Sequence, residues 1–253
     1  MKNHTGHRRG GPVVLALVLS VALLSGCRDL LDVELPAQLT DDVLTDPRNA
    51  AIIVNSFIGH WEYAWDKQVY WNFGREAGGE VHLCGPCGYS DFQTGSPVFG
   101  GNDGSMAKSL RFSRDLWNKL DKEWDVKAVP DRARFMALAS IYQGAALSWA
   151  GSTLCEVALN GGKKQTAAET LTQAEAMLTR ALTEIAALPG GDFAVVNGIA
   201  TSAKTMVYGL RAQTRYMQAN MTGAAQDAAQ VPNGFVAWNT REGGEARQNF
   251  GWY

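Results

Sequence analysis

The sequence has little proline and little cysteine, and neither sign of charge dominates it. Eight prolines and four cysteines are spread over 253 residues, and 23 lysines and arginines stand against 25 aspartates and glutamates, for a formal net charge of −2. This balance argues against nucleic acid as a partner, because binding the phosphate backbone requires a basic surface. Beyond the apolar run 13–24, no stretch is long and apolar enough to span a membrane as a helix.

Recognisable catalytic motifs are also missing. The sequence contains no Gly-x-Ser-x-Gly, no His-Glu-x-x-His and no glycine loop of the kind that cradles phosphate. The carboxylate pair Asp41 and Asp42 flanks a helix start, where capping accounts for it. His60 and His82 have no identifiable nucleophile partner. We therefore expect no enzymatic activity, no cofactor and no bound metal.

The N-terminus has the three parts of a bacterial lipoprotein signal. Basic residues precede the apolar run 13–24, and Ser25-Gly26 then supplies the small residues that a signal peptidase requires. Leu24-Ser25-Gly26-Cys27 resembles a lipobox, in which the cysteine thiol is lipidated and becomes the new N-terminus. Cys27 is therefore the predicted lipidation site.

This signal divides the chain into three predicted parts. They are a signal peptide at 1–26, a lipidated tether at 27–44 and a helical domain at 45–253. Arg28 is not the aspartate that can retain lipoproteins at the inner membrane. We therefore expect a lipid-anchored protein of the outer membrane.

Apolar residues recur at helical spacing in the rest of the chain. The spacing predicts helices at about 46–70, 106–124, 131–150, 166–188 and 203–221, and a short one at about 223–230. Asp46-Pro47 suits the start of the first helix, and Thr166 with Glu169 predicts a capping box. No run is typical of a strand. The sequence therefore predicts an all-α fold. In it, 151–165 is a loop, and Met217 and Met221 continue the apolar stripe of the helix at 203–221.

Alanine and glycine lie on several of the predicted helix faces. Such small residues permit close packing of the kind seen in helical-hairpin repeats. No tetratricopeptide signature recurs at a fixed period, so we expect an irregular array of helical hairpins with long glycine-rich loop excursions.

The longest excursion is the segment 72–104, which holds nine glycines and two prolines and has no periodicity. A structureless loop of this length inside a domain is usually functional or disordered. Trp71, at the end of the preceding helix, and four residues of this segment are the predicted ligand-binding set: Trp71, Arg75, Tyr89, Asp91 and Phe92. Trp61 and Trp65 lie on the apolar stripe of the preceding helix, which favours core packing for both.

Three cysteines remain besides the lipidated one: Cys84, Cys87 and Cys155. In an oxidising envelope this odd count predicts one disulfide and one spare thiol, and we expect Cys155 to pair with Cys84 or Cys87. Cys84-Gly85-Pro86-Cys87 also matches the thioredoxin frame, although no βαβ pattern surrounds it. A redox pair and a zinc site that includes His82 remain the less favoured alternatives.

Three segments carry a family resemblance: DLLDVELP at 29–36, RARFMALASIY at 132–142 and AKTMVYGLRA at 203–212. Together they resemble segments of SusD/RagB-type outer-membrane lipoproteins. After Cys27, the run 29–36 is similar to the opening of that family. The segments 132–142 and 203–212 are similar to two of its helices, in the same order. The resemblance covers most of 27–230. Family members are usually much longer, so the chain is expected to be the N-terminal part of such a protein, with a C-terminal part missing.

The resemblance implies tetratricopeptide-like helical hairpins and a role in nutrient uptake. Such a protein lies at the cell surface, binds glycans or peptides outside the cell and delivers them to a partner SusC-like TonB-dependent transporter. Cys155 departs from the family pattern, which has small or acidic residues at that turn. The alternative function is a helical-repeat scaffold that binds other envelope proteins.

Overall fold

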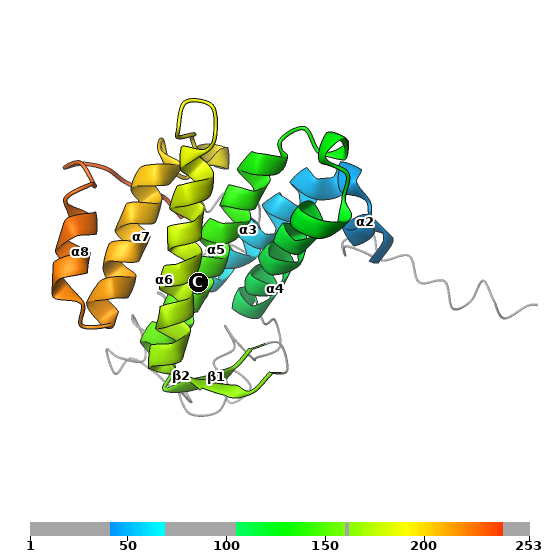
Figure 1. Cartoon of the computed structure of the whole chain (residues 1–253). Coiled ribbons are helices and arrows are strands. Elements are labelled where there is room, and N and C mark those ends of the chain that lie inside the picture. Colours follow the sequence, from blue (N-terminus) through cyan, green and yellow to red (C-terminus); the bar gives the residue numbers. More distant parts are fainter. Residues whose placement is uncertain (1–40, 69–104, 160–161, 240–253) are drawn as a thin grey trace, which may run out of the picture. The chain divides into compact units, whose positions relative to one another are not determined.

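The computed structural model describes residues 41–68, 105–159 and 162–239 (Figure 1). The chain divides into a short unit, 1–43, and a larger unit, 44–253, and the account below concerns the larger one. Its main helices are α3 (Ala50–Gln68), α4 (Ser105–Asn118), α5 (Arg132–Thr153), α6 (Ala167–Ala186), α7 (Ala203–Met217) and α8 (Met221–Ala228). Its shorter elements are η2 (Pro47–Asn49), η5 (Lys119–Glu123), η6 (Val126–Ala128) and η7 (Val196–Gly198), and α2 (Asp41–Thr45) spans the boundary between the two units.

Each long helix packs against the next one along the chain. Contacts join α3 to α4, α4 to α5, α5 to α6, α6 to α7 and α7 to α8, as Figure 1 shows. The helix α5 also contacts α3 and α7, which places it at the centre of the array. The predicted all-α class is therefore confirmed in its coarse form.

Local sequence signals begin and end these helices as predicted. The Asp46 carboxylate accepts a hydrogen bond from the Arg48 amide at 2.9 Å, ahead of α3. At the start of α6, the Thr166 amide donates to the Glu169 carboxylate at 2.7 Å, and the Glu169 amide donates back to the Thr166 hydroxyl. These bonds hold the pKa of Glu169 below its ordinary value. After α6, Gly190 and Gly191 adopt φ values of 83° and 64°, which favour glycine.

The helix α5 is buried on every side from Ala137 to Gly151. The residues at helical spacing, such as Leu138, Tyr142 and Trp149, are buried as their spacing predicts, and the burial extends to the other faces of the helix, which the spacing did not predict. A helix surrounded by neighbours has no solvent face, and its small residues allow those neighbours to approach closely. A Cβ added to Gly144 would lie 2.6 Å from Cγ of Leu178, and one added to Gly151 would lie 2.7 Å from Cγ of Leu171.

Two predictions are corrected. The predicted loop 151–165 begins with the last turn of α5 and then forms an antiparallel hairpin of β1 (Glu156–Ala158) and β2 (Lys164–Thr166). Strands of three residues are too short to leave a periodic pattern, which is why the sequence did not predict them. Met217 and Met221 lie on the surface, with 43% and 54% of their area exposed, rather than on a buried stripe.

Within the described ranges, no helix combines the length and the apolar character that crossing a bilayer requires.

Candidate functional site

A cavity of about 530 Å³ opens beside the central helix α5. Its walls come from α3, α5, α7 and the segment that follows α8. The lining includes Trp61, Glu62, Trp65, Tyr142, Ser148, Trp149, Ile199, Met206, Leu210, Gln213, Phe235, Trp238 and Asn239. A volume of this size lies within the range of small-molecule sites, which are mostly apolar with a few placed polar groups.

Indole rings form much of the cavity wall. Trp61 and Trp65 lie one helical turn apart on α3, and their rings stack with centroids 5.7 Å apart and an interplanar angle of 18°. The rings of Tyr142 and Trp61 form a T-shaped pair, with an interplanar angle of 77° and centroids 6.3 Å apart. Trp149 adds a third indole from α5 and Trp238 a fourth, which is 64% exposed. The site therefore offers several flat apolar faces to a ligand.

Polar groups converge on the same cavity. Glu62 is 3% exposed and Tyr142 1% exposed, although both line it. Burial raises the pKa of Tyr142, and the nearby charge of Glu62 raises it further. The Tyr142 hydroxyl and the Asn239 side-chain oxygen are buried and have no hydrogen-bond partner in the described part of the chain. Such atoms can bind a ligand group, because an unsatisfied buried polar atom costs about 1–3 kcal/mol.

The segment after α8 is fixed in place by hydrogen bonds to two walls of the cavity. The Asn239 amide nitrogen donates to the Glu62 carbonyl at 3.0 Å, and the Trp238 backbone amide donates to the Ile199 carbonyl at 2.7 Å. Residues far apart in the sequence thus complete one site.

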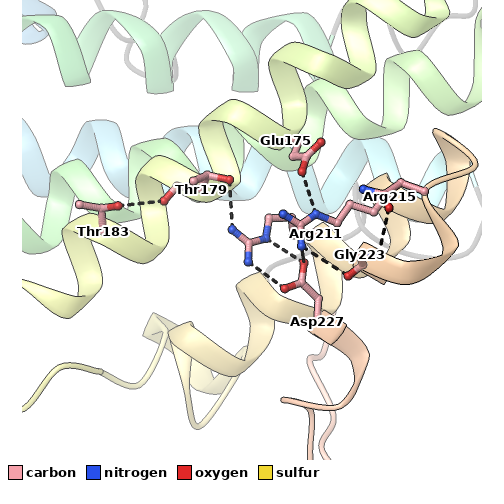
Figure 2. A network of polar contacts seen from close by, with 8 residues as sticks. Glu175, Thr179, Thr183, Arg211, Arg215, Gly223 and Asp227 are labelled. Carbon is pink, nitrogen blue, oxygen red and sulfur yellow. Dashed lines mark hydrogen bonds and ion pairs between the residues drawn. The ribbon is translucent and has the colours of Figure 1, made fainter. Parts of the chain in front are cut away.

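A second polar cluster joins α6, α7 and α8 (Figure 2). Asp227 accepts two hydrogen bonds from Arg211, both at 2.8 Å, and one from Arg215 at 3.0 Å. Arg215 also donates to Glu175 at 2.7 Å, and Arg211 to the Thr179 hydroxyl at 3.1 Å. The hydrogen bonds to Asp227 raise the pKa of Arg211. Because its charges are mutually paired, this cluster is a structural clamp on α8 rather than a ligand site.

Most of the residues that the sequence nominated lie outside the described residues. This applies to Cys27, to the predicted ligand set Trp71, Arg75, Tyr89, Asp91 and Phe92, and to Cys84 and Cys87. Their roles stay predictions. Cys155 is described: it is exposed, directly precedes β1 and forms no disulfide within the described residues.

The sequence missed the role of Trp61 and Trp65. Their helical spacing favoured core packing, and both do pack against buried residues, but each also lines the cavity. The one feature of the sequence that could have indicated a binding site here was the pair of large indoles a single helical turn apart. The contribution of 235–239 left no signal, because the tertiary structure alone brings this segment to α3.

Comparison with family models, with curated proteins and with solved structures finds no match for the chain. In the described part of the chain, no three histidine, cysteine, aspartate or glutamate side chains gather where they could hold a metal ion.

Proposed function

We propose that the chain is a lipid-anchored outer-membrane protein that binds glycan or peptide nutrients and delivers them to a partner SusC-like TonB-dependent transporter. The lipobox at Cys27 supports the anchor, and the ordered family-like segments support the partner. The paired helices are compatible with tetratricopeptide-like hairpins, the finer fold that this proposal includes. The protein acts by binding rather than by catalysis.

The observation that carries the proposal is the aromatic cavity. Sugar rings and peptide side chains both present apolar faces that stack on indoles such as Trp61 and Trp65. Their polar groups can bond to the Tyr142 hydroxyl and to the Asn239 side-chain oxygen. A fixed scaffold with these groups in place loses little conformational entropy on binding.

Calorimetric titration of the full-length chain in detergent micelles against oligosaccharides and peptides tests ligand binding. Trp65→Ala removes a cavity wall and should weaken binding roughly thirtyfold, the loss of about 2 kcal/mol typical of an aromatic contact in a packed site. Trp124→Ala is the matched control, since Trp124 follows η5 and does not line the cavity. Equal affinity of Trp65→Ala and the unmodified chain would refute the cavity as the binding site.

Membrane anchoring and partnership are tested separately. Cys27→Ala should release the protein from membranes, because stable anchoring requires more than one acyl chain and a lipoprotein cysteine receives them. A mutant that still sediments with carbonate-washed membranes would contradict the lipidation site. Affinity purification of the tagged chain from its own outer membranes should recover a TonB-dependent transporter.

A scaffold function is the second candidate. Tyr216, Met217 and Met221 are exposed together around the turn between α7 and α8, and exposed apolar groups of this kind mark protein contacts. Replacing both methionines with serine should then abolish recovery of an envelope protein while leaving ligand titrations unchanged. The nutrient-binding proposal predicts the reverse pattern for Trp65→Ala.

A further inference from the structure

Two buried polar atoms of the cavity lack partners, and they differ in the bonds they can make. The Asn239 amide nitrogen donates to the Glu62 carbonyl, which fixes the orientation of this side chain and leaves its oxygen able only to accept. Burial raises the pKa of Tyr142, so its hydroxyl keeps its proton and can donate. Neither atom has a hydrogen-bond partner in the described part of the chain. The pair therefore suits a ligand that offers both a donor and an acceptor.

Both atoms lie near Glu62, at one end of the cavity. The Asn239 nitrogen bonds to the main chain of Glu62 at 3.0 Å, and the side chain of Glu62 is close enough to Tyr142 to contribute to its raised pKa. Glu62 itself has a further interaction within the protein, so its side chain is not counted among the groups left for a ligand. One short stretch of a ligand can thus contact the Tyr142 hydroxyl and the Asn239 oxygen together.

The smaller hydroxyl groups of the lining already have partners. Ser152 donates to the Ser148 carbonyl at 2.7 Å and Thr153 to the Trp149 carbonyl at 2.9 Å, both within α5. The Ser148 hydroxyl accepts from Thr214 at 2.8 Å. Every hydroxyl of a buried sugar would require a partner of its own, because an unsatisfied buried donor is costly. The lining therefore suits a ligand with few polar groups better than a polyhydroxylated one.

The rest of the wall is apolar. Ile199, Met206, Leu210 and Phe235 join the indoles described above. The described lining residues include no lysine, arginine or histidine, so an acidic ligand group would find no counter-ion among them. Burial of an apolar side chain is favourable in proportion to the area removed from water. A large neutral apolar group is therefore the best match to these walls.

We propose that the cavity is a peptide subsite that takes one large apolar side chain, with the main chain beside that side chain bonded to Tyr142 and Asn239. The Tyr142 hydroxyl donates to a peptide carbonyl, and the Asn239 side-chain oxygen accepts from a peptide N–H. Peptides combine these features, because each residue joins its side chain to one N–H and one carbonyl. This inference rests on the proposed nutrient-binding function and narrows its ligand from glycan or peptide to peptide.

Matched peptides that differ in one side chain test the proposal. The probes are Gly-Leu-Gly, Gly-Ala-Gly and Gly-Asp-Gly, each acetylated and amidated at its ends, and maltotetraose represents the glycans. Calorimetry with the full-length chain in detergent micelles should show that the leucine peptide binds at least roughly tenfold more tightly than the alanine peptide. The aspartate peptide and maltotetraose should bind more weakly than the leucine peptide. Titrations into empty micelles give the background.

Tyr142→Phe tests the role of the hydroxyl by two measurements. Affinity for the leucine peptide should fall roughly fivefold, the usual effect of losing one hydrogen bond. The melting temperature of the unliganded variant should not fall, because the hydroxyl makes no bond there that could be lost. A purely structural hydroxyl would give the opposite pattern, with unchanged affinity and a lower melting temperature.

Two further variants complete the design. Tyr208→Phe is the matched control: Tyr208 lies on α7 with its ring near Arg211, does not line the cavity and should leave peptide affinity unchanged. Asn239→Ala removes the acceptor and should also weaken binding of the leucine peptide, which keeps the test valid if Tyr142→Phe fails to fold. Circular dichroism monitors folding.

Three outcomes would overturn the inference: equal binding of the leucine and alanine peptides, unchanged affinity in both Tyr142→Phe and Asn239→Ala, or no binding of any peptide. If maltotetraose binds instead and Trp65→Ala abolishes that binding, the peptide inference fails and the nutrient-binding function stands. If no oligosaccharide or peptide binds and no transporter is recovered, both fail.

Discussion

Replacement of Asp227 by alanine should release α8 from the helical array. The Asp227 side chain is 4% exposed and accepts three hydrogen bonds from Arg211 and Arg215 (Figure 2). Removing one partner of a buried ion pair costs about 3–5 kcal/mol, because the opposite charge stays buried without compensation. Both arginines keep a second partner, Thr179 or Glu175, so the lower figure of about 3 kcal/mol applies.

The loss should be local rather than global. Apart from Asp227 itself, only Gly223 is buried among the residues of α8, so little apolar packing holds this helix. About 3 kcal/mol corresponds to a more than hundredfold change in an opening equilibrium. Hydrogen exchange followed by mass spectrometry should therefore show amides of 221–228 exchanging roughly a hundred times faster, with α5 unchanged.

Two further variants sharpen the reasoning. Asp227→Asn keeps the volume and one acceptor and should show an intermediate effect. Glu156→Ala breaks an exposed pair, Lys164 to Glu156 at 2.6 Å, and should cost less than about 1 kcal/mol. If α8 exchanges at the unmodified rate in Asp227→Ala, the clamp does not hold the helix and the argument from buried charge is wrong.

Gly144→Ala should lower the free energy of unfolding by about 1–3 kcal/mol in urea titrations, because its new methyl group would meet Leu178. Gly209→Ala, whose nearest neighbour would be 4.0 Å away, should instead be neutral or stabilise by up to about 1 kcal/mol; equal losses would contradict the packing argument. The pKa of Glu169 is lowered by its bonds to Thr166, so its contribution to stability is present above its ordinary value of 4.5 and is lost as pH falls below that value. Thr166→Ala should flatten this part of the profile of melting temperature against pH, and an unchanged slope would show that other carboxylates control it. Peptide mapping without reduction should find Cys155 bonded to Cys84 or Cys87, whereas a free Cys155 beside a Cys84–Cys87 bond would revive the redox alternative.

Features that depend on neighbours in the sequence could be predicted from it. The capping box at Thr166, the turn at Asp46-Pro47 and the glycines after α6 all involve contacts within a few residues. The hydrogen bonds and backbone angles that they require are local, so residue type and spacing suffice to predict them. The resulting helix boundaries were predicted to within a few residues.

Features that depend on several helices at once could not be predicted in this way. The burial of α5 on all sides follows from its four neighbours, and its own sequence shows only that it is apolar and small. The charged clamp unites Glu175, Arg211 and Asp227 from three helices, and each of these residues alone resembles an ordinary surface residue.

The sequence by itself determined the helical class and the starts and ends of the helices, because each depends on short-range chemistry. The lipid anchor at Cys27 stays a prediction from the sequence. Tertiary structure decided which large apolar residues are covered and which line a cavity. Trp61, Trp149 and Phe235 all carry large, mainly apolar side chains. They line one cavity together with Glu62 only because α3, α5 and the segment after α8 come close to one another in the folded protein. Periodicity reports the face of a helix that avoids water, but not whether a neighbouring helix fills that face completely.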